Sequence, residues 1–216
     1  AALESKGYDR VMLKTAKTNE EAVSPSGKRY VIDRSGWHLI LLAKNMTGYR
    51  NLCRLVSFGF MDDAFYHTPR IDHELLEQYH EGLICSSACL AGELPRKILQ
   101  GDLEGAEQTI LWFKQVFGED YYIELQRHQS DKPGSNQDVF QNQQKVNPIL
   151  IDLAHKHGVK LIATNDVHFV KEEHAEAHDR LLCISTQSRF DDPNRLHYTK
   201  QEWLKSPEEM QAIFSD

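Results

Sequence analysis

The sequence predicts an α/β fold in which short β-strands alternate with helices. Two observations support this prediction. Apolar runs of strand length recur along the chain, and longer segments with apolar residues at helical spacing lie between them. Strands separated by helices form parallel β/α units through right-handed crossovers, so we expect a parallel sheet with helices packed on it.

The expected elements can be placed from these patterns. The expected strands are "HLILLA", "GLICSS", "YYIELQ" and "VKLIAT", at residues 38–43, 82–87, 121–126 and 159–164, and we expect the last to be buried. The expected helices cover residues 45–60, 102–118 and 139–158. In the first helix, helical spacing relates Tyr49, Leu52, Cys53, Val56 and Phe60. A glycine ends the second, and Pro148 predicts a kink or a restart in the third.

The composition is typical of a soluble globular protein. The 216 residues are 40% hydrophobic and 26% charged, which suits one large domain or two small ones. No run approaches the roughly 18 apolar residues that a membrane-spanning helix needs, and the first residues lack the basic-then-apolar order of a secretory signal. We therefore expect a cytoplasmic protein without membrane contact.

Charge and cysteine content narrow the expected chemistry. The formal net charge is −7, so contact with a polyanion such as DNA requires local positive charge or bound metal. The four cysteines form no CxxC motif and lie mostly in apolar stretches: Cys53, Cys85, Cys89 and Cys183. We expect reduced, buried thiols rather than disulfides.

The stretch "LIATNDVHFV", residues 161–170, is the first candidate functional site. Asp166 and His168 follow an expected strand, and open α/β sheets and β/α barrels place functional groups at the carboxyl ends of their strands. In an extended chain, residues two apart point to the same side, so a carboxylate and an imidazole can converge on one metal ion. Alternatively, Asp166 caps a helix that begins near "EEHAEAH" and His168 is a surface residue.

Two histidine pairs are weaker candidates. His155 and His157 lie two apart at the end of a helix, about 200° apart around its axis, so they cannot easily share a metal ion. His174 and His178 lie one helical turn apart, which is a competent zinc spacing, but the HExxH glutamate is missing. For this second pair we favour a solvated position or a role in supporting other ligands.

Two further residues lie beside expected strands. Cys89 in "ICSSACLAGE" follows the strand at 82–87, in the same topological place as Asp166, whereas Cys85 lies inside that strand and belongs to the core. Cys89 can equally be a buried thiol at the start of a helix. His38 opens a strand, and a lone histidine there is more often structural than a ligand.

Many ordered blocks of the chain resemble the PHP (polymerase and histidinol phosphatase) domain of the alpha subunit of bacterial DNA polymerase III. They extend from Trp37 to Met210: "HLILLAKNMTGYRNLCRLVS", "TPRID", "EGLICSSACLAGELPRKILQGD", "YYIELQRH", "LIATNDVHF", "AEAHDRLLCI", "DDPNRLHY" and "SPEEM". The resemblance implies an α/β fold, a distorted seven-stranded β/α barrel, with a metal cluster at the carboxyl ends of its strands. The ligands that it implies are His38, Cys89, Asp166 and His168, with His128 and His178 as candidates to support them.

The chain also departs from the family pattern. The HxH pair, the "TDHG" segment and the "GCE" glutamate of the family are not found, and the residues that flank Glu4 do not match that last motif. We therefore expect residues 1–216 to be the C-terminal larger part of one PHP domain, an incomplete barrel. Residues 17–29 and 127–138 are expected to be mobile loops, and 200–216 to approach a following palm domain. We expect an incomplete site for divalent metal ions, with zinc favoured and manganese or iron as alternatives.

The resemblance implies a part of a replicative DNA polymerase that does not itself polymerise. Its expected role is a structural platform or a metal-dependent 3'-5' proofreading exonuclease site. Its expected partners are the palm and thumb domains of the alpha subunit, other replicase subunits including a proofreading exonuclease, and DNA through the parent enzyme. The alternatives are a stand-alone phosphoesterase for small phosphate esters, and an interaction module that binds a separate proofreading subunit. The blocks "TGYRNL" and "DDPNR" favour the polymerase branch.

Overall fold

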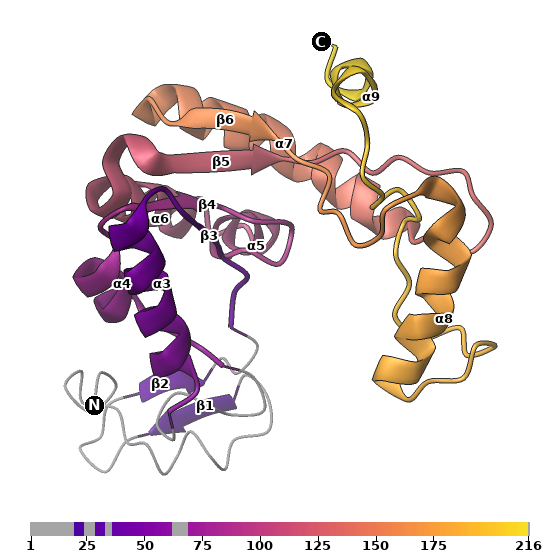
Figure 1. The fold of residues 1–216 in the computed structure, drawn as a ribbon, viewed down its shortest axis with the longest axis horizontal. Helices are drawn as coiled ribbons and strands as arrows, with labels where there is room; N and C mark the ends of the chain where they lie inside the picture. Colours follow the sequence, from indigo (N-terminus) through magenta and orange to yellow (C-terminus); the bar gives the residue numbers. More distant parts are fainter. Residues whose placement is uncertain (1–19, 24–28, 33–35, 62–68, 216) are drawn as a thin grey trace. The chain divides into compact units, whose positions relative to one another are not determined.

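The computed structural model describes residues 20–23, 29–32, 36–61 and 69–215 (Figure 1). Strands β1 (Glu20–Val23) and β2 (Arg29–Ile32) form an antiparallel pair. A four-stranded sheet has the order β3 (Ile40–Ala43), β4 (Leu83–Ser86), β5 (Tyr121–Leu125) and β6 (Lys160–Ala163). The α-helices are α3 (Met46–Gly59), α4 (His73–Tyr79), α5 (Glu93–Leu99), α6 (Leu103–Phe117), α7 (Gln137–His157), α8 (Ala175–Thr186) and α9 (Pro207–Ile213), with short 3-10 turns η1 (Gly118–Asp120) and η2 (Glu172–His174).

The chain divides into two compact units. Among the described residues, the first unit contains those up to Trp37 and those within Leu41–Ile84, and the second contains His38–Ile40 and those from Cys85 onward. All the candidate site residues belong to the second unit. Glu4 lies outside the described residues.

In the first unit, helix α3 buries Leu55 together with Gly48, Asn51 and Gly59. Asn45 caps the helix by accepting a 3.0 Å hydrogen bond from the backbone N–H of Gly48. Gly48 lies so close to Gly82 that an added Cβ would sit 1.8 Å from its carbonyl oxygen, so only glycine fits there. The helical spacing in this segment is confirmed, and Tyr49, Val56 and Phe60 on it are solvent-exposed.

The second unit has a core between a parallel sheet and three helices. Tyr122↔Lys160 to Leu125↔Ala163 define the parallel register of β5 and β6, and Cys85 pairs with Tyr121 in parallel across β4 and β5. Figure 1 shows β5 beside β6, and α7 contacts both strands. The buried side chains of this core include Leu94, Ile98, Ile110, Phe113, Phe117, Tyr121, Ile123, Val146 and Leu150. The predicted alternation of parallel strands and helices is therefore confirmed in this unit.

The edges of the sheet explain two differences from expectation. Strand β6 is only partly buried, with Lys160 and Ala163 exposed, because it is the last strand of the four-stranded sheet in the described residues. The described residues do not close a seven-stranded barrel, because β3 and β6 are separate edges of that sheet.

Two local expectations also differ from the structure. Helix α7 continues through Pro148 without a restart, because the buried Val146 and Leu150 on either side of it pack into the core. Residues 20–23 and 29 belong to the antiparallel pair instead of an expected loop, and the rest of 17–29 lies outside the described residues.

The other expected loop, 127–138, is irregular only up to Asn136, where the side chain caps α7. The backbone N–H of His128 donates to Gln143 Oε1 at 2.8 Å, that of Asn136 donates to the carbonyl oxygen of Tyr198 at 3.0 Å, and Lys200 Nζ donates to that of Pro133 at 2.6 Å. These bonds anchor the stretch along its length, and its mobility stays a prediction.

Within the part of the chain that the structure describes, no helix is both long and apolar enough to cross a membrane.

Candidate metal site

His38 and Cys89 meet at a tight turn that follows β4. The backbone N–H of His38 donates to the carbonyl oxygen of Ala91 at 3.0 Å, and His38 forms an isolated parallel bridge with Gly92. Cys89 Sγ then lies 3.6 Å from His38 Nδ1. The turn is strained as well as tight: Ala88 has a φ of 59°, and a Cβ at Gly92 would lie 2.1 Å from the carbonyl oxygen of Ser87.

The thiol of Cys89 is half-buried and protonated. Burial raises its pKa above the ordinary value, backbone hydrogen bonding at Ala91 opposes the rise, and the adjacent Asp166 carboxylate adds to it. Asp166 is therefore a direct neighbour of Cys89. A metal ion that binds this thiol has to displace its proton.

Asp166 stands at a corner directly after β6. Its φ is +43°, a left-handed conformation that is uncommon for a residue other than glycine. The preceding Asn165 is buried, and its side-chain amide donates to the carbonyl oxygens of Gln201 at 2.8 Å and Trp203 at 2.7 Å. Asp166 is not a helix cap, because η2 and α8 begin after Lys171 and His174, neither with a side-chain cap. The capping alternative is therefore wrong.

His168 is exposed, and its hydrogen bonds define its tautomer. Nδ1 lies 2.6 Å from the carbonyl oxygen of Asp166, which can only accept, so Nδ1 carries the proton. Nε2 then carries the lone pair, and the Tyr198 hydroxyl lies 3.1 Å from it. The backbone N–H of His168 donates to the carbonyl oxygen of Glu202 at 2.8 Å.

The structure thus makes neighbours of the four residues His38, Cys89, Asp166 and His168, here called the ligand row. Cys89 Sγ lies 3.6 Å from His38 Nδ1, the Asp166 carboxylate is near enough to raise the pKa of the Cys89 thiol, and the Asp166 carbonyl oxygen accepts from the ring of His168. Within the described residues, no three His, Cys, Asp or Glu side chains form a group that could hold a metal ion. The ligand row is therefore a series of contacts and not a preformed cage, and its role as a ligand set stays a prediction.

A buried group of polar side chains lies behind the ligand row, and we call it the supporting layer: Glu124, Gln126, His128 and Asn165. Glu124 Oε1 accepts from the Ser86 hydroxyl, and Oε2 accepts from Thr164 Oγ1 at 2.5 Å. Ser86 is the last residue of β4, Thr164 directly follows β6, and Glu124 belongs to β5. One carboxylate therefore joins the ends of three strands. Glu124 and Cys89 also line a common small cavity of about 10 Å³.

His128 fixes the backbone beside Asp166. Its Nδ1 accepts from Gln143 Nε2 at 3.1 Å, and its Nε2 donates to the carbonyl oxygen of Asn165 at 3.2 Å. Burial lowers the pKa of His128, so the ring is neutral in the folded protein. With both ring nitrogens engaged, His128 positions the corner and does not offer an atom to a metal ion.

His178 lies against the exposed side of the ligand row. Its ring centroid is 5.8 Å from that of His168, 5.2 Å from that of Phe169 and 5.2 Å from that of Tyr198. Burial and the neighbouring His168 lower its pKa. His174, its partner at zinc spacing, is exposed on η2.

The other singled-out residues lie elsewhere. His157 Nε2 lies 2.8 Å from Glu107 Oε1 and His155 is exposed, so this pair does not share a site. All four cysteines are free, but only Cys85 is buried and Cys53 is exposed, which corrects the expectation of buried thiols. Burial raises the pKa of Cys85 far above its ordinary value.

Sequence reasoning missed Glu124 and the segment 198–204. A charged residue between apolar residues in "YYIEL" was a usable signal for Glu124. Segment 198–204 carries no such pattern, although it holds the corner through Glu202, Trp203 and Tyr198. Its own fold depends on Glu202, whose Oε1 accepts from the Thr199 backbone at 2.9 Å and hydroxyl at 2.6 Å.

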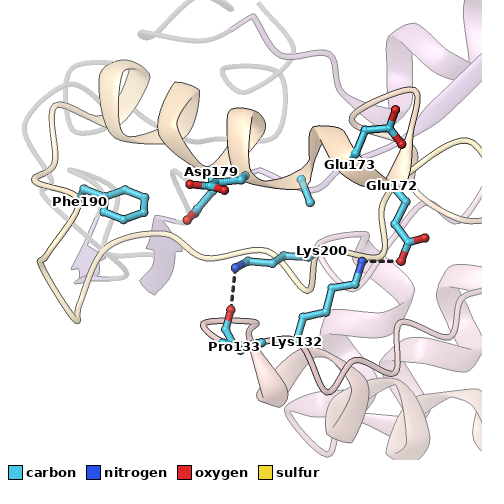
Figure 2. A pocket seen from close by; sticks show the side chains of 9 residues that line it. Lys132, Pro133, Glu172, Glu173, Asp179, Phe190 and Lys200 are labelled. Atoms are coloured by element: carbon cyan, nitrogen blue, oxygen red, sulfur yellow. Dashed lines mark hydrogen bonds and ion pairs between the residues drawn. The ribbon is translucent and has the colours of Figure 1, made fainter.

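A larger open cavity, of about 400 Å³, lies between loop 127–138 and helix α8 and does not include the ligand row (Figure 2). Lys132 Nζ pairs with Glu172 Oε1 at 2.7 Å, and Lys200 Nζ donates to the carbonyl oxygen of Pro133. Asp179 forms a buried, bidentate ion pair with Arg195 at 2.6 and 2.7 Å. Because these charged groups already have partners, the cavity is a weaker candidate site than the ligand row.

Comparison with known proteins shows which family the chain belongs to. The family model of the PHP domain matches residues 8–128, which is more than half of the chain. The chain is 43% identical over 211 residues to the DNA polymerase III subunit alpha of Borreliella burgdorferi, an alignment that covers 97% of this chain and 17% of that protein. It is 46% identical over 187 residues to the protein of the same name from Treponema pallidum, covering 86% and 15%, and 42% identical over 176 residues to that from Deinococcus radiodurans, covering 81% and 12%.

Proposed function

The chain belongs to the PHP domain family, and from this premise we propose that it is the metal-binding part of a replicative DNA polymerase alpha subunit. In the parent protein it is a platform for the palm and thumb domains and for other replicase subunits, and it carries a metal-dependent 3'-5' exonuclease site. Relatives named DNA polymerase III subunit alpha support this proposal, although the chain spans only 12–17% of their length. The same membership supports a distorted seven-stranded barrel as the complete fold.

The observation that carries the proposal is the ligand row. Pairwise contacts link two imidazoles, a thiol and a carboxylate that come from three separate parts of the sequence. A carbonyl oxygen holds His168 Nδ1–H and leaves the lone pair on Nε2, which is how proteins commonly orient a metal-binding histidine. This donor set fits zinc best, with manganese or iron as alternatives.

In this arrangement each part of the chain has a separate task. His38, Cys89, Asp166 and His168 would hold the ion, while Glu124 and His128 keep the strand ends and the corner in place. A bound divalent ion supplies the positive charge that a phosphodiester requires and that a chain of net charge −7 otherwise lacks.

Titration calorimetry with zinc and with manganese tests the binding half of the proposal. We expect weak binding to the wild-type chain, because the ligand row is not preformed, and loss of that binding in an Asp166→Ala, His168→Ala double variant. His155→Ala is a matched control, since it removes an exposed imidazole at the end of α7. Equal affinity of the wild type and the double variant would show that the pair does not bind metal.

Nuclease and polymerase assays test the other half. On single-stranded DNA with added zinc or manganese, we expect little or no hydrolysis by the chain alone, and we also expect no primer extension. Strong metal-dependent hydrolysis that the double substitution abolishes would contradict the expectation of an incomplete site. Template-dependent nucleotide incorporation by the purified chain would contradict the assignment to a part of the polymerase that does not polymerise.

A further inference from the structure

Tyr198 occupies the atom of His168 that the proposed function assigns to a metal ion. The carbonyl oxygen of Asp166 fixes the proton on Nδ1, so the Tyr198 hydroxyl, 3.1 Å from Nε2, must be the donor in that hydrogen bond. The Nε2 lone pair can accept this proton or bind a metal ion, but not both. Phenol and metal ion therefore compete for one nitrogen.

The ring of Tyr198 packs against two histidine rings, and these limit how the side chain can move. The Tyr198 ring centroid lies 4.6 Å from that of His168 and 5.2 Å from that of His178. The backbone at Tyr198 is also held, because its carbonyl oxygen accepts from the N–H of Asn136 at 3.0 Å. The phenol can therefore lose its hydrogen bond to Nε2 while its backbone stays in place.

We propose that Tyr198 is a positioning residue of the metal site, which holds His168 Nε2 as its acceptor in the metal-free protein and releases it when a divalent ion binds. The inference rests on the proposed function, because it requires His168 to be a ligand. It assigns a role in the site to the segment 198–204, which contributes no residue to the ligand row.

The test compares zinc binding by the wild type, Tyr198→Phe and Tyr122→Phe. Tyr198→Phe keeps the ring and removes only the competing hydroxyl, so zinc should bind about three- to tenfold more tightly, the range that one hydrogen bond is worth. Tyr122→Phe is the control, because it removes a hydroxyl from a half-buried tyrosine on β5 and should leave the affinity unchanged. Unchanged or weaker binding by Tyr198→Phe would overturn the proposal.

A spectroscopic signature separates this role from a merely structural one. Zinc should change the tyrosine absorbance of the wild type, because the phenol loses its acceptor, and this difference should vanish in Tyr198→Phe and persist in Tyr122→Phe. A difference that persists in Tyr198→Phe would overturn the proposal.

His168→Ala distinguishes the two ways of failing. If His168→Ala weakens zinc binding but Tyr198→Phe does not strengthen it, the role of Tyr198 is wrong and the proposed function stands. If His168→Ala leaves zinc affinity unchanged, the proposed function fails at this residue, and the role of Tyr198 fails with it.

Discussion

Two regions at the strand ends of the second unit invite comparison: the supporting layer and the ligand row. The four side chains of the supporting layer are 2–7% exposed, and each makes hydrogen bonds to other parts of the unit. In the ligand row, His38 and His168 are exposed, and Cys89 and Asp166 are half-buried. Burial and side-chain hydrogen bonds are thus concentrated in the supporting layer rather than in the residues that the proposed function uses. This is the arrangement in which ligands can change partners without unfolding the strand ends.

The largest expected effect comes from removing Glu124. Glu124→Ala leaves the Ser86 and Thr164 hydroxyls and the Gln126 amide without their carboxylate acceptor, so we expect it to lower the free energy of unfolding by about 3 kcal/mol. Urea denaturation monitored by circular dichroism measures this change.

Two further variants sharpen that measurement. Glu124→Gln keeps the shape of the side chain and one acceptor oxygen, so it should lower the free energy of unfolding by less than Glu124→Ala does. Asp166→Ala, His168→Ala removes two members of the ligand row and should change the free energy of unfolding by less than about 1 kcal/mol. An equal loss in the double variant and in Glu124→Ala would remove the distinction between the two regions.

The second prediction uses the pH dependence of His128. Burial lowers the pKa of His128 in the folded protein below its ordinary value of 6.5, so below pH 6.5 the unfolded chain binds a proton that the folded protein resists. The contribution of neutral His128 to the free energy of unfolding is fully present above pH 6.5. It is lost as the pH falls from 6.5 through the folded pKa, by at most about 1.4 kcal/mol per pH unit.

Urea denaturation between pH 7.5 and pH 5 tests this linkage in the wild type, His128→Asn and His155→Gln. The decline in stability on acidification should be shallower in His128→Asn, because the titrating group is gone. His155→Gln removes an exposed imidazole and should retain the wild-type decline. If His128→Asn and the wild type lose stability in parallel, the buried neutral histidine does not support the corner as described.

The four strands of the sheet and helices α3, α6 and α7 could be predicted from the sequence, because their signals are local, whereas the β1–β2 pair and helices α4, α5 and α9 were not predicted. The boundaries of β5 and α6 follow from an apolar run and from helical periodicity that ends at Gly118. The contacts of segment 198–204 could not be predicted in this way. The bond from Asn165 to the carbonyl oxygen of Trp203 joins residues 38 apart in the sequence, and no periodic pattern encodes it.

The candidate site was predictable only in part for the same reason. Short motifs and a family resemblance made Asp166 and His168 candidates, but their spacing left helix capping open until the structure placed the caps elsewhere. The restart that Pro148 predicted was wrong. Helix propensity is a local signal, whereas the packing of α7 around Pro148 involves residues that are distant in the sequence.

The smallest expected effect concerns backbone strain at the corner. Asp166 has a φ of +43°, which glycine adopts without strain, whereas the adjacent Val167 is not among the residues with positive φ. Asp166→Gly should therefore raise the free energy of unfolding by about 0.5 kcal/mol, because relief of strain exceeds the extra entropy of glycine in the unfolded chain. Val167→Gly carries the entropy cost without the relief and should lower it by about 0.5–1 kcal/mol. If urea denaturation shows that the two variants change the free energy of unfolding in opposite directions, the corner holds Asp166 at an energetic cost. Residues at functional sites are often held in this way. If both glycine variants lose stability equally, the left-handed backbone costs nothing, and the contrast between a relaxed supporting layer and a strained ligand row fails at this residue.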